Sequence, residues 1–188
     1  MTEHFDRLIN KAIELQKNGK LTEARSVYFE VLQIEPNNHQ LYKMLSSLEY
    51  QNRNFEKSLQ YIDKAINLKN NSSELYSIKG FYSYVSNKKK DAKELFEKAL
   101  KLDINNIEAL LNLGVILKEN NETLKAIDCF NKIISLDEKN YKALVNRAYI
   151  KIDIRNYQDA LKDINKVLSL NQKYFNGYLM RGSIYREL

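Results

Sequence analysis

The chain has 188 residues and a formal net charge of +6, with one proline, five glycines and one cysteine. No run of about 18 apolar residues occurs, which argues against a membrane-spanning helix, and a lone cysteine excludes a disulfide within the chain. The first residues show no basic stretch followed by an apolar one, so no signal peptide is expected. Few helix breakers and many strong helix formers indicate a largely helical protein.

Residue types recur every 34 positions along the sequence. One set of small residues comprises Ala24, Ser58, Ala92, Ala126 and Ala160. Bulky residues follow four positions later at Tyr28, Ile62, Phe96, Phe130 and Ile164. An upstream set of small residues keeps the same spacing at Ala12, Ser46, Gly80, Gly114, Ala148 and Gly182. A fixed period of this length is typical of stacked structural repeats.

In chain order, the period predicts a tail over residues 1–4 and a single repeat domain over 5–188. The repeats are 5–38, 39–72, 73–106, 107–140 and 141–174, followed by a partial sixth repeat over 175–188. In the fourth repeat, Leu110, Leu113, Gly114 and Leu117 follow helical spacing, and a second apolar stripe begins at Leu124 after a polar break. Each repeat is therefore expected to be a helix, an Asn-rich turn and a second helix.

Neither helix of such a pair can bury its apolar stripe alone, so neighbouring pairs must cover one another. We expect the small residues, such as Gly114 and Ala126, to lie where two helix backbones approach closely. A larger side chain there would overpack the contact at a cost of about 1–3 kcal/mol. Lys11, Lys79, Arg147 and Arg181 share another register position, where their stems are expected to pack while their charged ends reach water.

This pattern resembles the tetratricopeptide repeat family over essentially residues 5–188. The matching features are the two small positions, the bulky residue four positions later, the Ala99–Leu102 type of ending, and Pro36 at the end of the first repeat. The other repeats lack that proline. The resemblance implies an all-α, right-handed α-solenoid of about five and a half repeats. A pentatricopeptide array, which would bind RNA, is disfavoured because its repeats are longer and end differently.

The resemblance also implies that the first helices line a concave groove that holds a peptide or helix of a partner protein. The residues expected to face this groove are Lys43, Tyr50, Phe81, Tyr84, Leu111, Val115, Lys118, Lys142, Val145, Tyr149, Ile152 and Leu179. Exposed apolar and aromatic residues favour an interaction site. Packing of the same residues on neighbouring first helices stays open as an alternative.

A subclass of the family clamps a carboxyl-terminal carboxylate with a set of Lys, Asn and Arg side chains. Lys43 fits that set, but Ser47 and Ile78 stand where asparagines are required, so no such clamp is expected. The sequence also lacks a Gly-rich phosphate loop and an HExxH motif. His4 and His39 have no second ligand at metal-binding spacing.

Enzyme activity, catalytic residues, cofactors and metal sites are therefore not expected. Cys129 is interpreted as a small packed hydrophobic residue. Carboxylates such as Asp159 and Asp163 are expected on solvent-facing surfaces.

The leading hypothesis is a cytoplasmic, non-enzymatic scaffold that binds a protein partner. Two alternatives stay open. The fifth repeat carries seven basic and three acidic residues, a balance that also suits nucleic acid, although nucleic acid is the less favoured partner. The final helix leaves Tyr178, Ile184 and Tyr185 without a second helix, which would suit self-association into a homo-oligomer.

Overall fold

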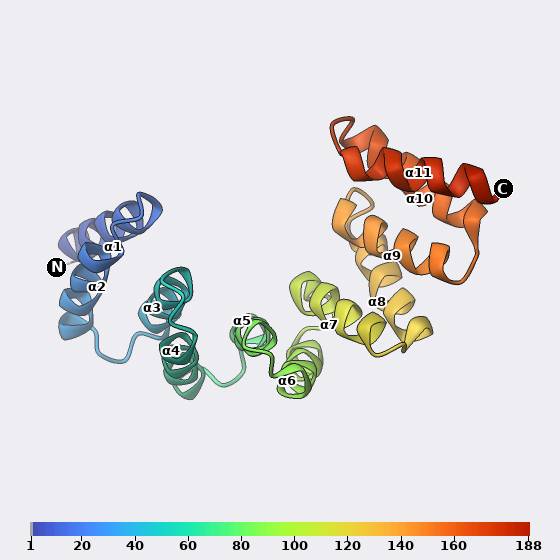
Figure 1. Cartoon of the computed structure of the whole chain (residues 1–188). Helices are drawn as coiled ribbons and strands as arrows, with labels where there is room; N and C mark the ends of the chain where they lie inside the picture. Colours follow the sequence, from blue (N-terminus) through green and yellow to red (C-terminus); the bar gives the residue numbers. More distant parts are fainter. Residues whose placement is uncertain (1) are drawn as a thin grey trace. The chain divides into compact units, whose positions relative to one another are not determined.

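A computed structural model describes residues 2–188, with side chains from residue 4 onward. Over this range the regular elements are eleven α-helices, and the first ten form consecutive antiparallel pairs (Figure 1). The predicted all-α architecture of stacked helix pairs is confirmed. The helices are α1 (Thr2–Lys17), α2 (Leu21–Ile34), α3 (His39–Gln51), α4 (Phe55–Leu68), α5 (Ser73–Val85), α6 (Lys89–Leu102), α7 (Ile107–Glu119), α8 (Thr123–Leu136), α9 (Tyr141–Asp153), α10 (Tyr157–Leu170) and α11 (Phe175–Glu187).

The helices fall into two compact units. The N-terminal unit ends at Leu102 and contains α1–α6, and the C-terminal unit, Asp103–Leu188, contains α7–α11. Within the N-terminal unit α2 packs on α3 and α4 on α5, and within the C-terminal unit α8 packs on α9 and α10 on α11. Each repeat therefore meets the next in its unit through a second helix and the following first helix. One continuous domain over 5–188 stays a prediction.

Helix α1 begins at Thr2, so residues 2–4 belong to the first helix and not to a separate tail. The segment from Thr2 to Phe5 contains neither glycine nor proline, so nothing in it stops the helix. At the other end of the described chain, α11 is the single helix of the partial sixth repeat, as the period predicts.

The turn inside each full repeat uses one backbone conformation at one register position. Gly19, Arg53, Asn87, Asn121 and Arg155 are spaced by the repeat period, and each has a positive φ between 59° and 76°. At Arg53 the turn closes with hydrogen bonds from Arg53 N to Tyr50 O (2.9 Å) and from Asn54 N to Glu49 O (2.8 Å). This pattern is a Schellman motif, which satisfies the last carbonyl groups of the first helix.

Asparagines in the turns inside repeats and in the links between repeats also begin the next helix. The side chains of Asn54, Asn106, Asn140 and Asn156 each accept a hydrogen bond from a backbone N–H three residues on. Asn38 and Ser72 cap α3 and α5 in the same way. Such caps satisfy donors that a helix start otherwise leaves unpaired, and each contributes about 1 kcal/mol. The Asn-rich segments between helices therefore also start the helix that follows.

The small residues of the first helices make room for bulky side chains from the second helices. A Cβ added to Gly80 would lie 2.8 Å from the Phe96 ring, and one added to Gly114 would lie 2.8 Å from the Phe130 ring. Both rings are fully buried. Close approach was expected between two backbones, but at these glycines the crowding atoms belong to an aromatic ring.

Replacing Gly114 with alanine should lower the free energy of unfolding by about 1–3 kcal/mol, because the added Cβ would overlap the fully buried Phe130 ring, which must then shift within a packed core. The matched control is Gly182→Ala, since a Cβ there would meet nothing within 4 Å. That control should be neutral or up to about 1 kcal/mol more stable, because alanine is the better helix former. Urea unfolding of dilute protein measures both. Equal effects of the two changes would contradict the proposed crowding.

Candidate partner-binding surface

The predicted groove residues of the C-terminal unit lie on its first helices, and we call this set the C-terminal face. It comprises Leu111, Val115 and Lys118 of α7, Lys142, Val145, Tyr149 and Ile152 of α9, and Leu179 of α11. Helices α7 and α9 contact one another. Most of the aliphatic members are half-buried, whereas Tyr149 is 37% and Leu179 57% exposed.

Within the C-terminal face, Lys118 and Tyr149 are brought together. The Lys118 ammonium lies 5.0 Å from the centre of the Tyr149 ring, in cation–π contact between successive first helices. Tyr174, which precedes α11, was not predicted to belong here. Burial raises the pKa of Tyr174, and the nearby hydroxyl groups of Tyr149 and Tyr141 raise it further. Tyr174 ends its repeat, and the repeat period gives that position no role in the groove.

The N-terminal unit presents a different first-helix surface, the N-terminal face, formed by Lys43, Tyr50, Phe81 and Tyr84. The Tyr50 ring centre lies 5.4 Å from that of Phe81 and 5.0 Å from that of the buried Tyr82. Lys43 forms an ion pair with Glu74 on the next first helix at 2.8 Å. Tyr50 and Phe81 therefore pack on each other, as the intramolecular alternative expects.

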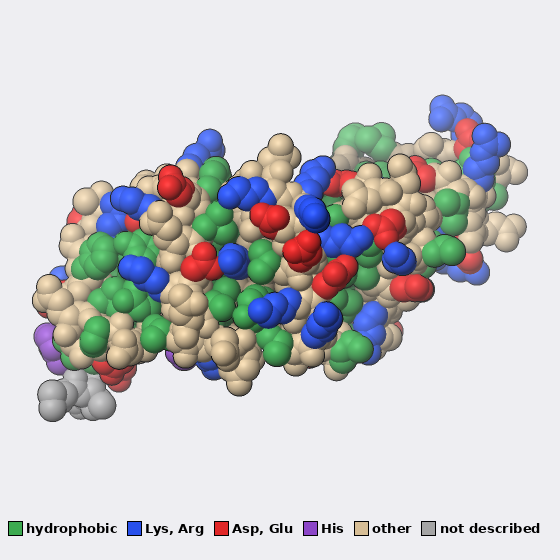
Figure 2. All heavy atoms as spheres, turned by 90° about the horizontal axis from the view of Figure 1, so that it is seen from below, with side chains coloured by type: hydrophobic (Ala, Val, Ile, Leu, Met, Phe, Trp, Pro, Cys, Tyr) green, Lys and Arg blue, Asp and Glu red, His purple; other side chains and the backbone are tan. Residues whose placement is uncertain are grey.

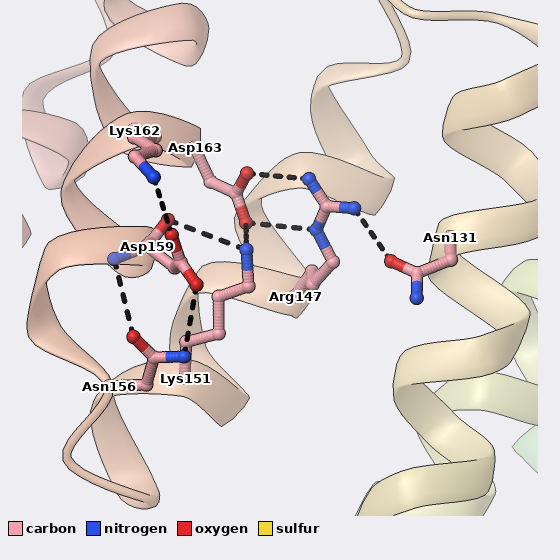
Figure 3. A network of polar contacts seen from close by, with 7 residues as sticks. All are labelled: Asn131, Arg147, Lys151, Asn156, Asp159, Lys162 and Asp163. Carbon is pink, nitrogen blue, oxygen red and sulfur yellow. Dashed lines mark hydrogen bonds and ion pairs between the residues drawn. The ribbon is translucent and has the colours of Figure 1, made fainter.

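A buried carboxylate holds two cations of the fifth repeat (Figure 3). Asp163 is 4% exposed. Arg147 donates to both of its oxygens, at 2.6 Å from Nη2 and 2.9 Å from Nε, and Lys151 Nζ donates to Oδ2 at 2.9 Å. Arg147 also donates to Asn131 of the preceding repeat at 2.6 Å. The expected solvent-facing position of Asp163 is wrong, because the two basic residues on α9 draw this carboxylate inward.

Similar polar contacts recur where one repeat meets the next. Lys79 pairs with Asp63 at 2.7 Å, and Arg181 donates to Asn165 at 3.3 Å. The Arg147–Asn131 contact has the same form. In all three contacts, a basic residue of a first helix binds the residue sixteen positions earlier, which lies on the second helix of the preceding repeat. The charged ends of Lys79 and Arg181 therefore pair with the preceding repeat at contacts that stay accessible to water, as expected.

Much of the basic charge of the fifth repeat is paired. Besides Arg147 and Lys151, Lys162 pairs with Asp159 at 2.8 Å and Lys166 lies 3.8 Å from Glu138. On the face drawn in Figure 2, basic and acidic side chains are interspersed. The charge balance of the sequence therefore overstates the basic surface that this repeat offers.

The described residues were also compared with what a metal site, a membrane span or a reactive cysteine requires. They contain no cluster of three or more His, Cys, Asp or Glu side chains able to hold a metal ion. The described helices include none that is long and apolar enough to span a membrane. Cys129 is partly buried, and burial raises the pKa of its thiol to about 11, with a further contribution from Asp128. This agrees with a packed, unreactive side chain.

Alkylation of Cys129 should be slow in the folded chain. Because its pKa is raised from 9.0 to about 11, the thiolate fraction at pH 8 falls about 100-fold, and the thiolate is the reactive form. The rate with iodoacetamide should rise about tenfold per pH unit from pH 7 to 9. The urea-unfolded chain is the control. Equal rates in the folded and unfolded chains would contradict the raised pKa.

Removing the Asp163 carboxylate should strongly destabilise the C-terminal unit. Asp163→Ala leaves Arg147 and Lys151 without their shared partner, and breaking a buried ion pair from one side costs about 3–5 kcal/mol. The control is Asp159→Asn, which removes a carboxylate from an exposed pair and should leave stability nearly unchanged. Thermal and urea unfolding measure both. An unchanged midpoint for Asp163→Ala would show that the buried cluster contributes little.

The tetratricopeptide repeat family matches residues 9–73, 95–128 and 141–174. No curated protein matches the sequence significantly.

Similar solved structures include pilF of Pseudomonas aeruginosa, at 15% identity and a TM-score of 0.87, with 99% of this chain and 86% of that chain covered. MamA is 22% identical with a TM-score of 0.74, covering 86% and 95%. YrrB, described as a TPR protein with an unusual peptide-binding site, is 18% identical with a TM-score of 0.71, covering 93% and 90%. These identities support the fold alone. The family matches together span more than half of the sequence. The structure repeats one helix pair with the 34-residue period of the sequence. The chain therefore belongs to the tetratricopeptide repeat family.

Proposed function

We propose that this chain is a non-enzymatic scaffold whose C-terminal face binds a peptide or helix of a partner protein. The observation that carries the proposal is the exposed Tyr149 ring in contact with the Lys118 ammonium. An aromatic ring beside a cation gives a partner segment both an apolar surface to pack against and a positive charge to pair with. Aromatic anchors of this kind supply a large share of binding energy at protein interfaces.

The neighbouring residues extend this anchor. Val115, Val145 and Ile152 are half-buried, so they offer apolar surface without much side-chain entropy to lose. Lys142 is exposed at the start of α9. With Lys118, it favours a partner segment that combines apolar side chains with acidic ones. The charges would mainly raise the association rate, while the apolar contacts would set the dissociation rate.

We expect the N-terminal face to contribute less to partner binding than the C-terminal face. Tyr50 and Phe81 already pack on one another, and Lys43 is paired with Glu74. A partner would therefore gain less new apolar burial there. Partner binding of this kind fits the family, whose members typically act as non-catalytic scaffolds, and YrrB provides one relative of the same fold that is described as binding a peptide. A cytoplasmic location stays a prediction.

Nucleic-acid binding has less support. Four of the seven basic residues of the fifth repeat are paired with carboxylates. Cations held in this way release few counterions when a phosphate approaches, so they contribute little to binding.

A displayed library of random linear peptides can test the proposal. Enriched peptides should combine aromatic or aliphatic residues with acidic ones. Tyr149→Ala should weaken their binding about tenfold or more in fluorescence polarisation, because it removes the central anchor. The matched control is Leu124→Ala, which removes an exposed apolar side chain from the second helix α8. Binding that survives Tyr149→Ala but is lost in Leu124→Ala would place the site on the second helices and contradict the proposal.

A further inference from the structure

A cavity of about 470 Å³ lies between α4, α5 and α6 of the N-terminal unit. Leu59 of α4 and Leu95 of α6 line it with half-buried apolar side chains. Ser83 of α5 is its most buried lining residue, at 3% exposed. None of the lining residues belongs to the N-terminal face, so this cavity is a separate feature of the unit.

At the corresponding place between α2, α3 and α4, the chain supplies a guanidinium group of its own. Arg25 and Glu49 correspond by the 34-residue period to Leu59 and Ser83. Arg25 Nε donates to Glu49 Oε1 at 2.7 Å, and Glu49 is only 1% exposed. An arginine side chain therefore reaches this position and meets a carboxylate there.

The corresponding place between α8, α9 and α10 also holds a guanidinium group. Arg147 and Asp163 correspond to the lining residues Lys79 and Leu95, and Arg147 donates to both oxygens of Asp163. In the cavity, Lys79 instead pairs with Asp63 at 2.7 Å, and Leu95 carries no charge. Of the three places where a first helix lies between two second helices of one unit, this one alone lacks a guanidinium–carboxylate pair among the described residues.

The lining offers more unpaired negative charge than positive charge. Asp91 and Glu94 lie three residues apart on α6, and both are exposed. Neither forms an ion pair with any described residue. Among the lining cations, Lys98 lies 4.2 Å from the centre of the Tyr76 ring, and Lys88 is the remaining one without a partner. Two unpaired carboxylates beside one unpaired ammonium group favour a cationic ligand.

A guanidinium group suits this lining better than an ammonium group does. Its planar set of N–H donors can serve two carboxylates at once, whereas an ammonium group acts as a point charge. The methylene groups of an arginine can pack on the half-buried Leu59 and Leu95. The hydroxyl group of Ser83 has no hydrogen-bond partner among the described residues and can accept a further N–H. Because the carboxylates are exposed, the arginine can enter from a protein segment outside.

We propose that this cavity binds an arginine side chain of a partner protein. The guanidinium group lies at Asp91 and Glu94, and its methylene groups lie between Leu59 and Leu95. The partner thereby supplies from outside the group that Arg25 supplies from within the chain one repeat earlier. This site is separate from the C-terminal face, whose proposed partner segment is acidic, so each proposal can fail without the other.

Nuclear magnetic resonance of the isotope-labelled 188-residue chain, titrated with Nα-acetylarginine amide, tests the proposal. The backbone signals of Leu59, Ser83 and Leu95 should shift saturably. Nα-acetylcitrulline amide has nearly the same shape without the charge, so it should bind about tenfold more weakly. Nα-acetyllysine amide should also bind more weakly, because one ammonium group cannot serve both carboxylates equally well.

Three variants locate the binding groups. Asp91→Asn combined with Glu94→Gln should weaken arginine binding about tenfold, because both charged acceptors are lost. The matched control is Glu97→Gln, which removes an exposed carboxylate of α6 that does not line the cavity and should leave binding unchanged. Leu59→Arg places a guanidinium group at the register of Arg25. It should fill the cavity and abolish binding while circular dichroism shows unchanged helicity.

The absence of saturable shifts at the three lining residues overturns the proposal. Equal affinity for the arginine and citrulline probes, or for the arginine and lysine probes, overturns the guanidinium assignment. Binding that is unchanged by Asp91→Asn with Glu94→Gln also overturns it, because the carboxylates would then play no part. Tighter binding of Nα-acetylaspartate amide at the same signals would assign the cavity to an acidic side chain held by Lys88 and Lys98 and contradict the proposal.

Discussion

The fit of a bulky side chain from each second helix against a small residue of the first helix is the contact on which this structure depends. At Gly80 and Gly114 the fit is so close that even a Cβ would collide with a phenylalanine ring. Ala12 with Tyr28, and Ala148 with Ile164, share buried clusters at the same register. Because interiors are close-packed, each such contact fixes the separation of two helices and hence the surface that the first helices present.

Around this contact the polar residues divide into two roles. Asparagines at the links cap helix starts, and residues with positive φ close the turns, so the backbone repeats with little variation. Charged residues instead distinguish one repeat from another: Asp163 gathers Arg147 and Lys151 in the fifth repeat, while Lys43 and Glu74 join first helices in the N-terminal unit. The two faces differ in structure because Lys43 is paired with Glu74 and Tyr50 packs on Phe81 in one, whereas Tyr149 lies exposed beside Lys118 in the other.

Much of the fold could be predicted from the sequence, because a helix pair repeated at a fixed period leaves its core residues in register. The site could be predicted only as a set of positions. Phe81 shares its register position with Val115 and Tyr149, and Tyr50 shares another with Lys118. Yet Tyr50 and Phe81 pack on each other, while Tyr149 is exposed beside Lys118. Asp163 was misplaced because its burial depends on two cations of a neighbouring helix, which a single-helix pattern does not reveal.

The central claim is that the first helices of the C-terminal unit bind a partner segment while its second helices only support them. Nuclear magnetic resonance of the isotope-labelled chain, titrated with a peptide enriched from the displayed library, tests this most directly. The account predicts that the largest backbone shift changes fall on α7 and α9, around Lys118 and Tyr149. Changes concentrated on α8 and α10, with α7 and α9 unaffected, would contradict it.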